Sequence, residues 1–282
     1  MKPSTELRIG RLRGRVPRAL LPAVVEARTR VSRRSEAVRA DARAQMRFLI
    51  EHGRPDLDLD ATARAYLKFQ ALRGELRWRP QEITSLDVEG IDHLRDARAQ
   101  GPGVVISFMH HAFFEGGFAA IAGLGLPAHI VCYGYMLRDD APGWLQQHVR
   151  TATANGGEAF AADRGADEMA RLLREGEMLG IATDVPGRTP LRFAGRDVVG
   201  SFGAARLATS TGSPVVVMTS EQRDDGRFRI RLHEPFEPET FPDPTKLLEA
   251  MVAVHEDAQL RWPEAVDIPL ARWKLPAAGG DQ

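Results

Sequence analysis

The sequence of 282 residues contains one cysteine, four lysines and no long hydrophobic run, and each scarcity excludes a class of protein. Cys132 is alone, which excludes an intrachain disulfide framework and permits a reducing compartment. The longest apolar run near the N-terminus, Ala19 to Val25, is interrupted by Pro22. A membrane span needs roughly 20 apolar residues. We therefore expect neither a secretory signal nor a transmembrane helix.

Two familiar motifs are also absent. The chain has no Gly-x-Ser-x-Gly elbow, so a serine hydrolase has little support. The glycines at positions 116, 117, 123 and 125 do not form a dinucleotide fingerprint in a strand–turn–helix frame. The net charge is zero, which gives the whole molecule no nucleic-acid signal. With 43% hydrophobic and 27% charged residues, the composition is that of a globular protein large enough for one α/β domain or two small ones.

Charge is nevertheless uneven along the chain. Residues 1–34 contain ten Lys and Arg against two Glu, a surplus of eight positive charges. Between 7 and 34, arginines alternate with Leu, Ile and Val, a pattern that can lie on an anionic membrane surface. A solvated or poorly ordered arm explains the pattern equally well, and Pro17 and Pro22 argue against one unbroken helix. We divide the chain into a basic N-terminal arm, 1–34, and a domain with an N-terminal helical part, 35–282.

The most informative stretch follows a short apolar run, Gly103 to Phe108, that is typical of a buried strand. His110 and His111 come next, and Glu115 lies five positions after the first histidine. On one continuous helix, residues five apart point about 140° away from each other. His110 and Glu115 therefore meet only if the chain turns between a strand and a helix whose first turn holds Glu115.

A histidine with a carboxylate behind it is suited to act as a base, because the carboxylate fixes the tautomer and stabilises the imidazolium. The spacing alone favours a strand-end histidine bonded to a backbone carbonyl, with a surface glutamate nearby. A metal site formed by His110, His111 and Glu115 is less favoured. Consecutive residues leaving a strand tend to point to opposite faces, so we expect no metal.

Hydrophobic periodicity and turn residues predict the other elements. We expect helices at Glu36 to His52, Leu59 to Trp78, Ile91 to Gln100, Asp140 to Thr151, Ala166 to Arg174 and Thr245 to Leu260. We expect strands at Ser85 to Gly90, His129 to Tyr133, Met178 to Ala182 and Phe228 to Leu232. The strand that ends at Ala182 leads into the loop Thr183 to Arg188. Open α/β sheets place their ligands at such carboxyl ends.

Several of these segments together resemble one family. The matching segments are His110-x-x-x-x-Glu115 after a strand, Asp184 with Gly187-Arg188, Phe193-Ala194-Gly195-Arg196, Gly203 to Val216, Trp262-Pro263-Glu264 and Arg272-Trp273-Lys274. They resemble the bacterial lipid A biosynthesis (lauroyl/myristoyl) acyltransferase family of the lysophospholipid acyltransferase superfamily. That family includes phosphatidylinositol mannoside acyltransferases. The His-Arg-Arg usual in the last segment is not intact, so part of the substrate site is expected to differ.

The resemblance implies an α/β fold with a single acyltransferase domain, in which helices flank a mixed central sheet. It implies an O-acyltransferase that moves a fatty acyl chain from an acyl thioester, acyl-CoA or acyl carrier protein, to a hydroxyl of a glycolipid or phospholipid. His110 would be the general base and Glu115 its orienting partner, with no metal and no cofactor beyond the acyl co-substrate. General base catalysis is worth roughly 10²–10⁴-fold.

The same resemblance supplies candidate substrate-binding residues, namely Arg150, Arg164, Asp184 and Arg188. A guanidinium binds phosphate bidentately, which suits an anionic donor or lipid headgroup. A structural Arg–Asp pair, for example with Asp163 or Asp184, is the alternative for each arginine.

Three functions remain open: a membrane-associated glycolipid or phospholipid acyltransferase, an acyltransferase for a soluble secondary metabolite, and a non-catalytic lipid- or acyl-carrier-binding relative. Arginine supplies 34 of the 38 basic residues, which indicates GC-rich coding and weakly favours a phosphatidylinositol mannoside acceptor over lipid A. We expect a cytoplasmic location. The basic arm would allow peripheral attachment to the anionic inner face of the cell membrane.

Overall fold

The computed structural model describes residues 2–273 and 275, and a seven-stranded sheet lies at its centre. The strand order is β1-β9-β8-β2-β5-β3-β4. Strands β8, β2, β5, β3 and β4 are parallel, β9 is antiparallel to β8, and β1 is parallel to β9. The predicted mixed sheet is therefore confirmed. The strand bounds are β1 Asp87–Glu89, β2 Val105–Phe108, β3 His129–Cys132, β4 Glu158–Ala161, β5 Leu179–Ala182, β8 Val215–Gln222 and β9 Phe228–Leu232.

Alternate residues of the central strands enter different cores, as the two-residue period of a strand requires. On β2, Val105 belongs to one cluster, while Ile106 and Phe108 belong to the cluster on the other face. Both faces are covered, which explains why these strands read as continuous apolar runs and not as alternating ones.

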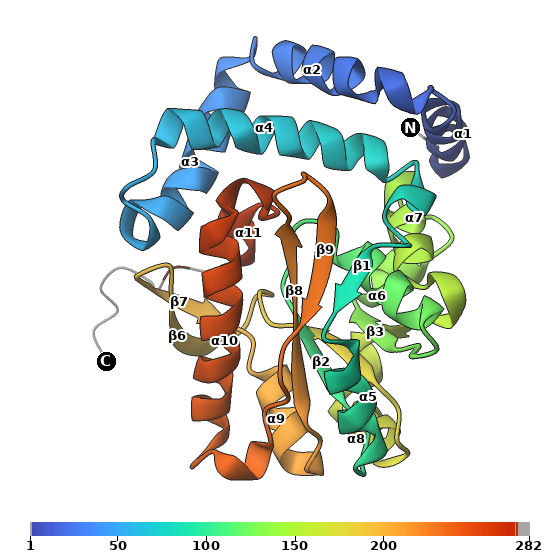
Figure 1. Ribbon diagram of the computed structural model, residues 1–282, viewed down its shortest axis with the longest axis vertical. Coiled ribbons are helices and arrows are strands. Elements are labelled where there is room, and N and C mark those ends of the chain that lie inside the picture. The colour runs from blue at the N-terminus through green and yellow to red at the C-terminus, as the bar shows by residue number, and fades with distance from the viewer. Residues whose placement is uncertain (1, 274, 276–282) are drawn as a thin grey trace.

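Helices flank the sheet on both faces (Figure 1). Packed against the face of Val105 are α8 Ala166–Arg174, α9 Gly203–Thr211, α10 Pro244–Arg261 and, farther out, α3 Glu36–Gly53. Against the face of Ile106 lie α5 Ile91–Ala99, α6 Phe114–Gly123 and α7 Gly143–Ala152. A third cluster joins α4 Leu59–Leu76 to Phe113 and Trp262. This cluster brings α4 close to the turn that carries His110.

The basic arm folds into two helices, α1 Pro3–Gly14 and α2 Leu21–Ser32, separated by a short 3-10 turn. The predicted break near the two prolines is confirmed, and Pro22 occupies the first turn of α2, where its missing N–H costs nothing. A Cβ on Gly10 would collide with the ring of Trp78, so α1 packs closely on the chain that follows α4. Figure 1 shows α2 and α4 crossing the same end of the molecule.

The predicted helices and strands are all present, with ends shifted by a few residues. The helix expected from Asp140 begins at Gly143, directly after Pro142. Strand β4, the hairpin formed by β6 Thr189–Phe193 and β7 Arg196–Gly200, and the short helix α11 Pro269–Arg272 were not predicted from the sequence. Lys274, in the last segment of the family resemblance, lies outside the described residues.

No helix in the described part of the chain is both long enough and apolar enough to cross a membrane.

Candidate active site

The chain turns sharply between β2 and α6, and Glu115 lies in the first turn of α6, as predicted. Ala112 adopts a left-handed conformation with φ 50° between the strand and α6. Its N–H donates to the carbonyl of Ala265 (2.9 Å), and the N–H of Asp267 donates to the carbonyl of His110 (2.9 Å). The C-terminal segment thus holds the turn in place. The His110 imidazole is consequently fixed at the carboxyl end of β2.

Asp184 is the partner of His110. Its Oδ1 lies 2.8 Å from His110 Nδ1, and its Oδ2 accepts the backbone N–H of His110 at 2.9 Å. Strands β2 and β5 are adjacent and parallel, with Phe108 opposite Ala182, so the residues that follow each strand meet at one edge. The carboxylate assigns Nδ1 as the protonated nitrogen and leaves Nε2 as an acceptor.

The charges at this pair suit a neutral base beside an ionised acid. Burial lowers the pKa of His110 below its ordinary value, and the opposing attraction of Asp184 does not offset it. Burial alone would raise the pKa of Asp184, but the interactions with His110 and with Arg272, 3.7 Å away, outweigh it and hold that pKa below its usual value. Near neutral pH, His110 is therefore unprotonated at one nitrogen and ready to accept a proton.

The predicted pairing of Glu115 with His110 is wrong. Glu115 does lie in the first turn of α6, but it is 2% exposed, and its Oε1 lies 3.6 Å from His148 Nδ1. Its Oε2 lies 3.9 Å from Arg73. The physical reason is that Asp184, at the end of the adjacent strand, already occupies Nδ1 of His110. Glu115 is also not the surface glutamate that the alternative interpretation expected.

His111 points away from His110, as expected for consecutive residues leaving a strand. Its Nε2–H donates to the backbone carbonyl of Trp262 at 3.0 Å, and the side chain is buried. Burial lowers its pKa to about 4, so the ring is neutral. His111 thus has the structural role that spacing alone allowed for either histidine.

His110 opens onto an apolar cavity of about 280 Å³. Aliphatic and aromatic side chains from β2, β3, β5, α7, α8 and α9 line it, including Phe108, Ile130, Ile181, Val149, Met169 and Leu207. Cys132 also lines the cavity, but burial raises the pKa of its thiol to about 11. Since the thiolate is the nucleophilic form, this cysteine is unsuited to form a covalent intermediate at neutral pH. An apolar cavity with a histidine base at its edge can hold a hydrocarbon chain beside a reacting polar group.

A family model described as bacterial lipid A biosynthesis acyltransferase matches residues 73–274, about seven tenths of the chain. The chain belongs to this acyltransferase family. A solved structure of the 1-acyl-sn-glycerophosphate (LPA) acyltransferase PlsC from Thermotoga maritima is similar at 15% identity and a TM-score of 0.43. The similarity covers 79% of this chain and 95% of that one. A search of curated proteins found no match.

Membership in the lipid A acyltransferase family makes the protein an O-acyltransferase that acts on lipid substrates, with an acyl donor and a lipid acceptor. The family match begins at Arg73, so α1, α2, α3 and most of α4 lie before it.

The three predicted substrate-binding arginines of this acyltransferase do not line the cavity. Arg150 is exposed on α7, with a long contact of 3.5 Å to Gln146. Arg164 pairs with Glu168 at 2.6 Å. It therefore forms a structural ion pair, as the alternative interpretation allowed, although its partner is Glu168 and not Asp163. Arg188 is exposed on the loop whose Val185 and Pro186 line the cavity, and it forms no ion pair with any described residue.

Three site residues were missed from the sequence. His148 lines the cavity from α7, Arg272 approaches Asp184 from α11, and Arg73 is 5% exposed between Glu115 and Asp267. Arg272 belongs to a segment that the resemblance included, which was a usable signal. For Arg73, the signal was a charge in a helix expected to cover the core. Nothing in the sequence distinguishes His148 from an ordinary helix residue.

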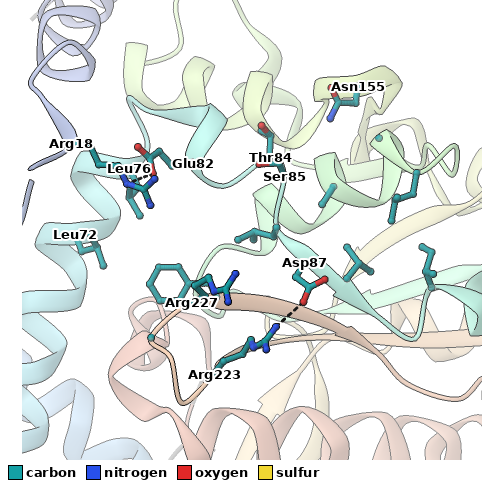
Figure 2. Close-up of a pocket in the computed structure, with 18 of the residues that line it drawn as sticks. Arg18, Leu72, Leu76, Glu82, Thr84, Ser85, Asp87, Asn155, Arg223 and Arg227 are labelled. Atoms are coloured by element: carbon teal, nitrogen blue, oxygen red, sulfur yellow. Dashed lines mark hydrogen bonds and ion pairs between the residues drawn. The ribbon is translucent and has the colours of Figure 1, made fainter.

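A larger cavity of about 1020 Å³ lies between β1, the β8–β9 turn and the end of α4 (Figure 2). Neither His110 nor Asp184 lines it. The three arginines that line it are each paired with an acid, Arg18 with Glu82 at 3.3 Å, Arg223 with Asp87 at 3.1 Å and Arg227 with Asp225 at 2.8 Å. These pairs leave little charge to select a ligand, so the smaller cavity is the candidate active site.

Among the described residues, no group of three or more His, Cys, Asp or Glu side chains is arranged to hold a metal ion.

Proposed function

We propose that this acyltransferase moves a fatty acyl chain from an acyl thioester, acyl-CoA or acyl carrier protein, to a hydroxyl of a glycolipid or phospholipid, with His110 as the general base and Asp184 as its orienting partner. The observation that carries the proposal is the position of His110. Its Nδ1 is bonded to a buried carboxylate, and its ring lies on an apolar cavity.

The reaction proceeds by direct attack. His110 Nε2 takes the proton of the acceptor hydroxyl while the hydroxyl oxygen attacks the thioester carbonyl carbon. The tetrahedral intermediate then expels the thiolate as the carbon–sulfur bond breaks, and the imidazolium of His110 returns the proton to that thiolate. Asp184 stabilises the imidazolium throughout, in the manner of other His–carboxylate pairs. The products are an ester and a free thiol.

Substrate charges would be met at the mouth of the cavity. Arg188 is the strongest candidate for contact with these charges. It is exposed, has no acidic partner among the described residues and lies on the loop that follows β5. Arg150 is also exposed and only weakly bonded. Both could bind phosphate of the donor or of the acceptor headgroup through bidentate guanidinium contacts. Arg164 would have to leave Glu168 to do the same.

The proposal includes peripheral attachment to an anionic membrane surface on the cytoplasmic side. Its support is the outer face of α1, where Arg8, Arg11 and Arg15 are exposed beside Leu12, which is 55% exposed. A basic amphipathic helix of this kind binds anionic lipid reversibly, through apolar contact and charge together.

A thiol-release assay tests the proposed function directly. Purified protein is given acyl-CoA or acyl carrier protein donors of several chain lengths, together with glycolipid and phospholipid acceptors in micelles. Free thiol and acylated acceptor should appear in equal amounts and survive chelation by EDTA, since no step uses a metal. No acceptor-dependent thiol release with any donor would refute the thioester mechanism. Comparing lipid extracts of a deletion strain and its parent would then identify the acceptor.

A further inference from the structure

Two histidine–carboxylate pairs open onto the same cavity. The first is His110 with Asp184. The second is His148 with Glu115, whose facing atoms are 3.6 Å apart. The ring of Phe114 lies between the two imidazoles, with centroids 4.8 Å from His110 and 5.5 Å from His148. Both histidine side chains are largely buried, with 17% and 14% exposed, and both line the cavity.

Glu115 is not a satisfied structural ion pair. Its Oε2 is buried without a hydrogen-bond partner, and Arg73 lies 3.9 Å away, beyond hydrogen-bonding distance. The main ion pair of Arg73 is with Asp267, at 2.7 Å. Burial alone would raise the pKa of Glu115, but Arg73 and His148 lower it to about 2, so the carboxylate is ionised. Burying a charge without full pairing costs stability, which calls for a functional reason.

Close packing of α6 determines where the Glu115 carboxylate lies. A Cβ on Gly116 would collide with the backbone carbonyl of Ile83, so α6 can approach the chain before β1 only because a glycine stands there. That approach sets Glu115 deep between α4 and α7, facing Nδ1 of His148. With Nδ1 directed at Glu115, the opposite nitrogen, Nε2, is the one available to a ligand in the cavity.

We propose that His148 is a second catalytic residue, which as an imidazolium stabilised by Glu115 donates its Nε2–H to the carbonyl oxygen of the acyl thioester. This inference rests on the proposed function. As the acceptor oxygen attacks, the electron pair of the carbonyl moves onto its oxygen, where the Nε2–H stabilises it by a charged hydrogen bond. The pair returns when the carbon–sulfur bond breaks, so His148 keeps its proton through the cycle while His110 carries the transferred one.

Such a donor fits what the reaction requires. The tetrahedral intermediate carries negative charge on oxygen, and a donor in a site shielded from water stabilises it far more than water would. A hydrogen bond from an ionised donor is roughly twice as strong as a neutral one. Acyl transfer thus has a base on one side of Phe114 and a cationic donor on the other.

Glu115 is the acid that can stabilise a protonated His148, because the other charged groups around the ring are mostly basic. Glu115 is the acid on α6 that faces it. The other ionisable groups near it, among the described residues, are Arg73 on α4 (3.9 Å from Glu115), Glu6, Arg8, Arg11 and Arg13 on α1, Arg77 of the chain after α4, Arg150 on α7 itself, Tyr135 beside α7, and His110, Cys132 and Tyr133 around the cavity. Glu6 accepts the backbone N–H of Gly143, at the far end of α7. Glu115 is therefore the acid positioned to hold the imidazolium.

The test compares His148→Ala and His148→Gln with wild type, using the best thioester donor and acceptor from the thiol-release assay. We expect H148A to lower kcat about 10²–10³-fold, the usual loss for one oxyanion donor, with both KM values within threefold. H148Q can place an amide N–H near Nε2, so we expect it to recover at least tenfold over H148A.

His129→Gln is the matched control. His129 is also largely buried and lies near two glutamates, but it is at the opposite end of β3 from the cavity residue Cys132. H129Q should keep the wild-type kcat and KM values.

A kcat for H148A within threefold of wild type would overturn the inference, as would a change confined to an acceptor KM or an H148Q variant no more active than H148A. If wild type is active and His110→Ala is not, these results refute the role of His148 alone. If wild type releases no thiol from any thioester, the proposed function fails, and this inference fails with it.

Discussion

Two buried carboxylates, Asp184 at the end of β5 and Glu75 on α4, are almost equally hidden from solvent, at 1% and 4% exposed. Glu75 pairs with Arg13 of α1 at 2.7 Å and also with Arg28 of α2. Asp184 receives two hydrogen bonds from His110. The pKa of each carboxyl is lowered by these partners, against the opposing effect of burial.

The difference lies in what the partners can do next. Arginine keeps its charge at any accessible pH, so the Glu75 pair can only hold α1 and α2 onto α4. Histidine changes charge near neutrality, and His110 lines a cavity. A buried ionised acid therefore indicates function only when its partner can exchange a proton and reach a ligand. The following predictions test this contrast, from the largest expected effect to the smallest.

His110→Ala should remove acyl transfer almost completely, by about 10⁴-fold, the upper end of the range for a general base. His111→Gln is the control, because a glutamine amide can still donate to the carbonyl of Trp262 and the variant should stay within threefold of wild type. The measurement is kcat/KM by thiol release, with circular dichroism to confirm folding. Equal losses in H110A and H111Q with unchanged melting temperatures would contradict the separate roles of the two histidines.

Asp184→Asn should lower kcat by about 10²–10³-fold, because an amide cannot stabilise the imidazolium and can donate to Nδ1, which favours the wrong tautomer. The loss should persist at every pH. In wild type, activity should rise with pH through a value below 6.5, since burial lowers the pKa of His110 and its base form survives to lower pH. Wild-type activity in D184N would show that Asp184, like Glu75, is only structural.

Glu75→Gln should reduce stability and leave kcat unchanged. The loss should be about 1–3 kcal/mol, less than for a fully buried pair, because the side chains of Arg13 and Arg28 are 33% and 45% exposed. The folded-state pKa of Glu75 is lowered, so its contribution is present above the ordinary value of 4.5 and is lost as pH falls below it. The difference in melting temperature between wild type and E75Q should therefore shrink in acid. A loss of kcat in E75Q at temperatures where it is fully folded would mean that the helical layer shapes the site.

The sequence predicted the elements around His110 well because their signals are local. The apolar run before His110 and the loop after Ala182 are each recognised from residues that are neighbours in the chain. The hairpin β6–β7 was missed because Pro190 within the run argues against a strand, and because Thr189 to Gly200 forms a separate two-stranded sheet.

The partner of His110 could not be derived in the same way. Glu115 is five residues away and Asp184 is 74, and only the register of β2 beside β5 decides between them. Both carboxylates were identified from the sequence as candidate site residues. However, Glu115 was predicted to orient the base and Asp184 to bind substrate, whereas Asp184 is the residue bonded to His110. Pairing between distant strands is not encoded in spacing, so this error is characteristic of reasoning along the chain.

The smallest effect, on vesicle binding, should come from the outer face of the arm. The arginines there do not pair with Glu75, unlike Arg13 and Arg28. Arg8 and Arg11 are exposed, whereas Gly10 and Gly14 face Trp78, so point variants can remove charge without detaching α1. Each basic residue near an anionic surface contributes about 1 kcal/mol at most, and salt screens it. Arg8→Gln with Arg11→Gln should weaken binding to anionic vesicles by a few-fold to about tenfold at physiological ionic strength, and hardly at all in about 1 M salt.

The control is Arg98→Gln with Arg174→Gln, which removes the same charge from exposed positions at the opposite end of the sheet. Turnover of a short-chain donor with a water-soluble acceptor should be the same in both variants. Vesicle binding is measured by co-sedimentation. If both double variants bind as well as wild type, the arm has no role in membrane attachment and is only a structural layer held by Glu75.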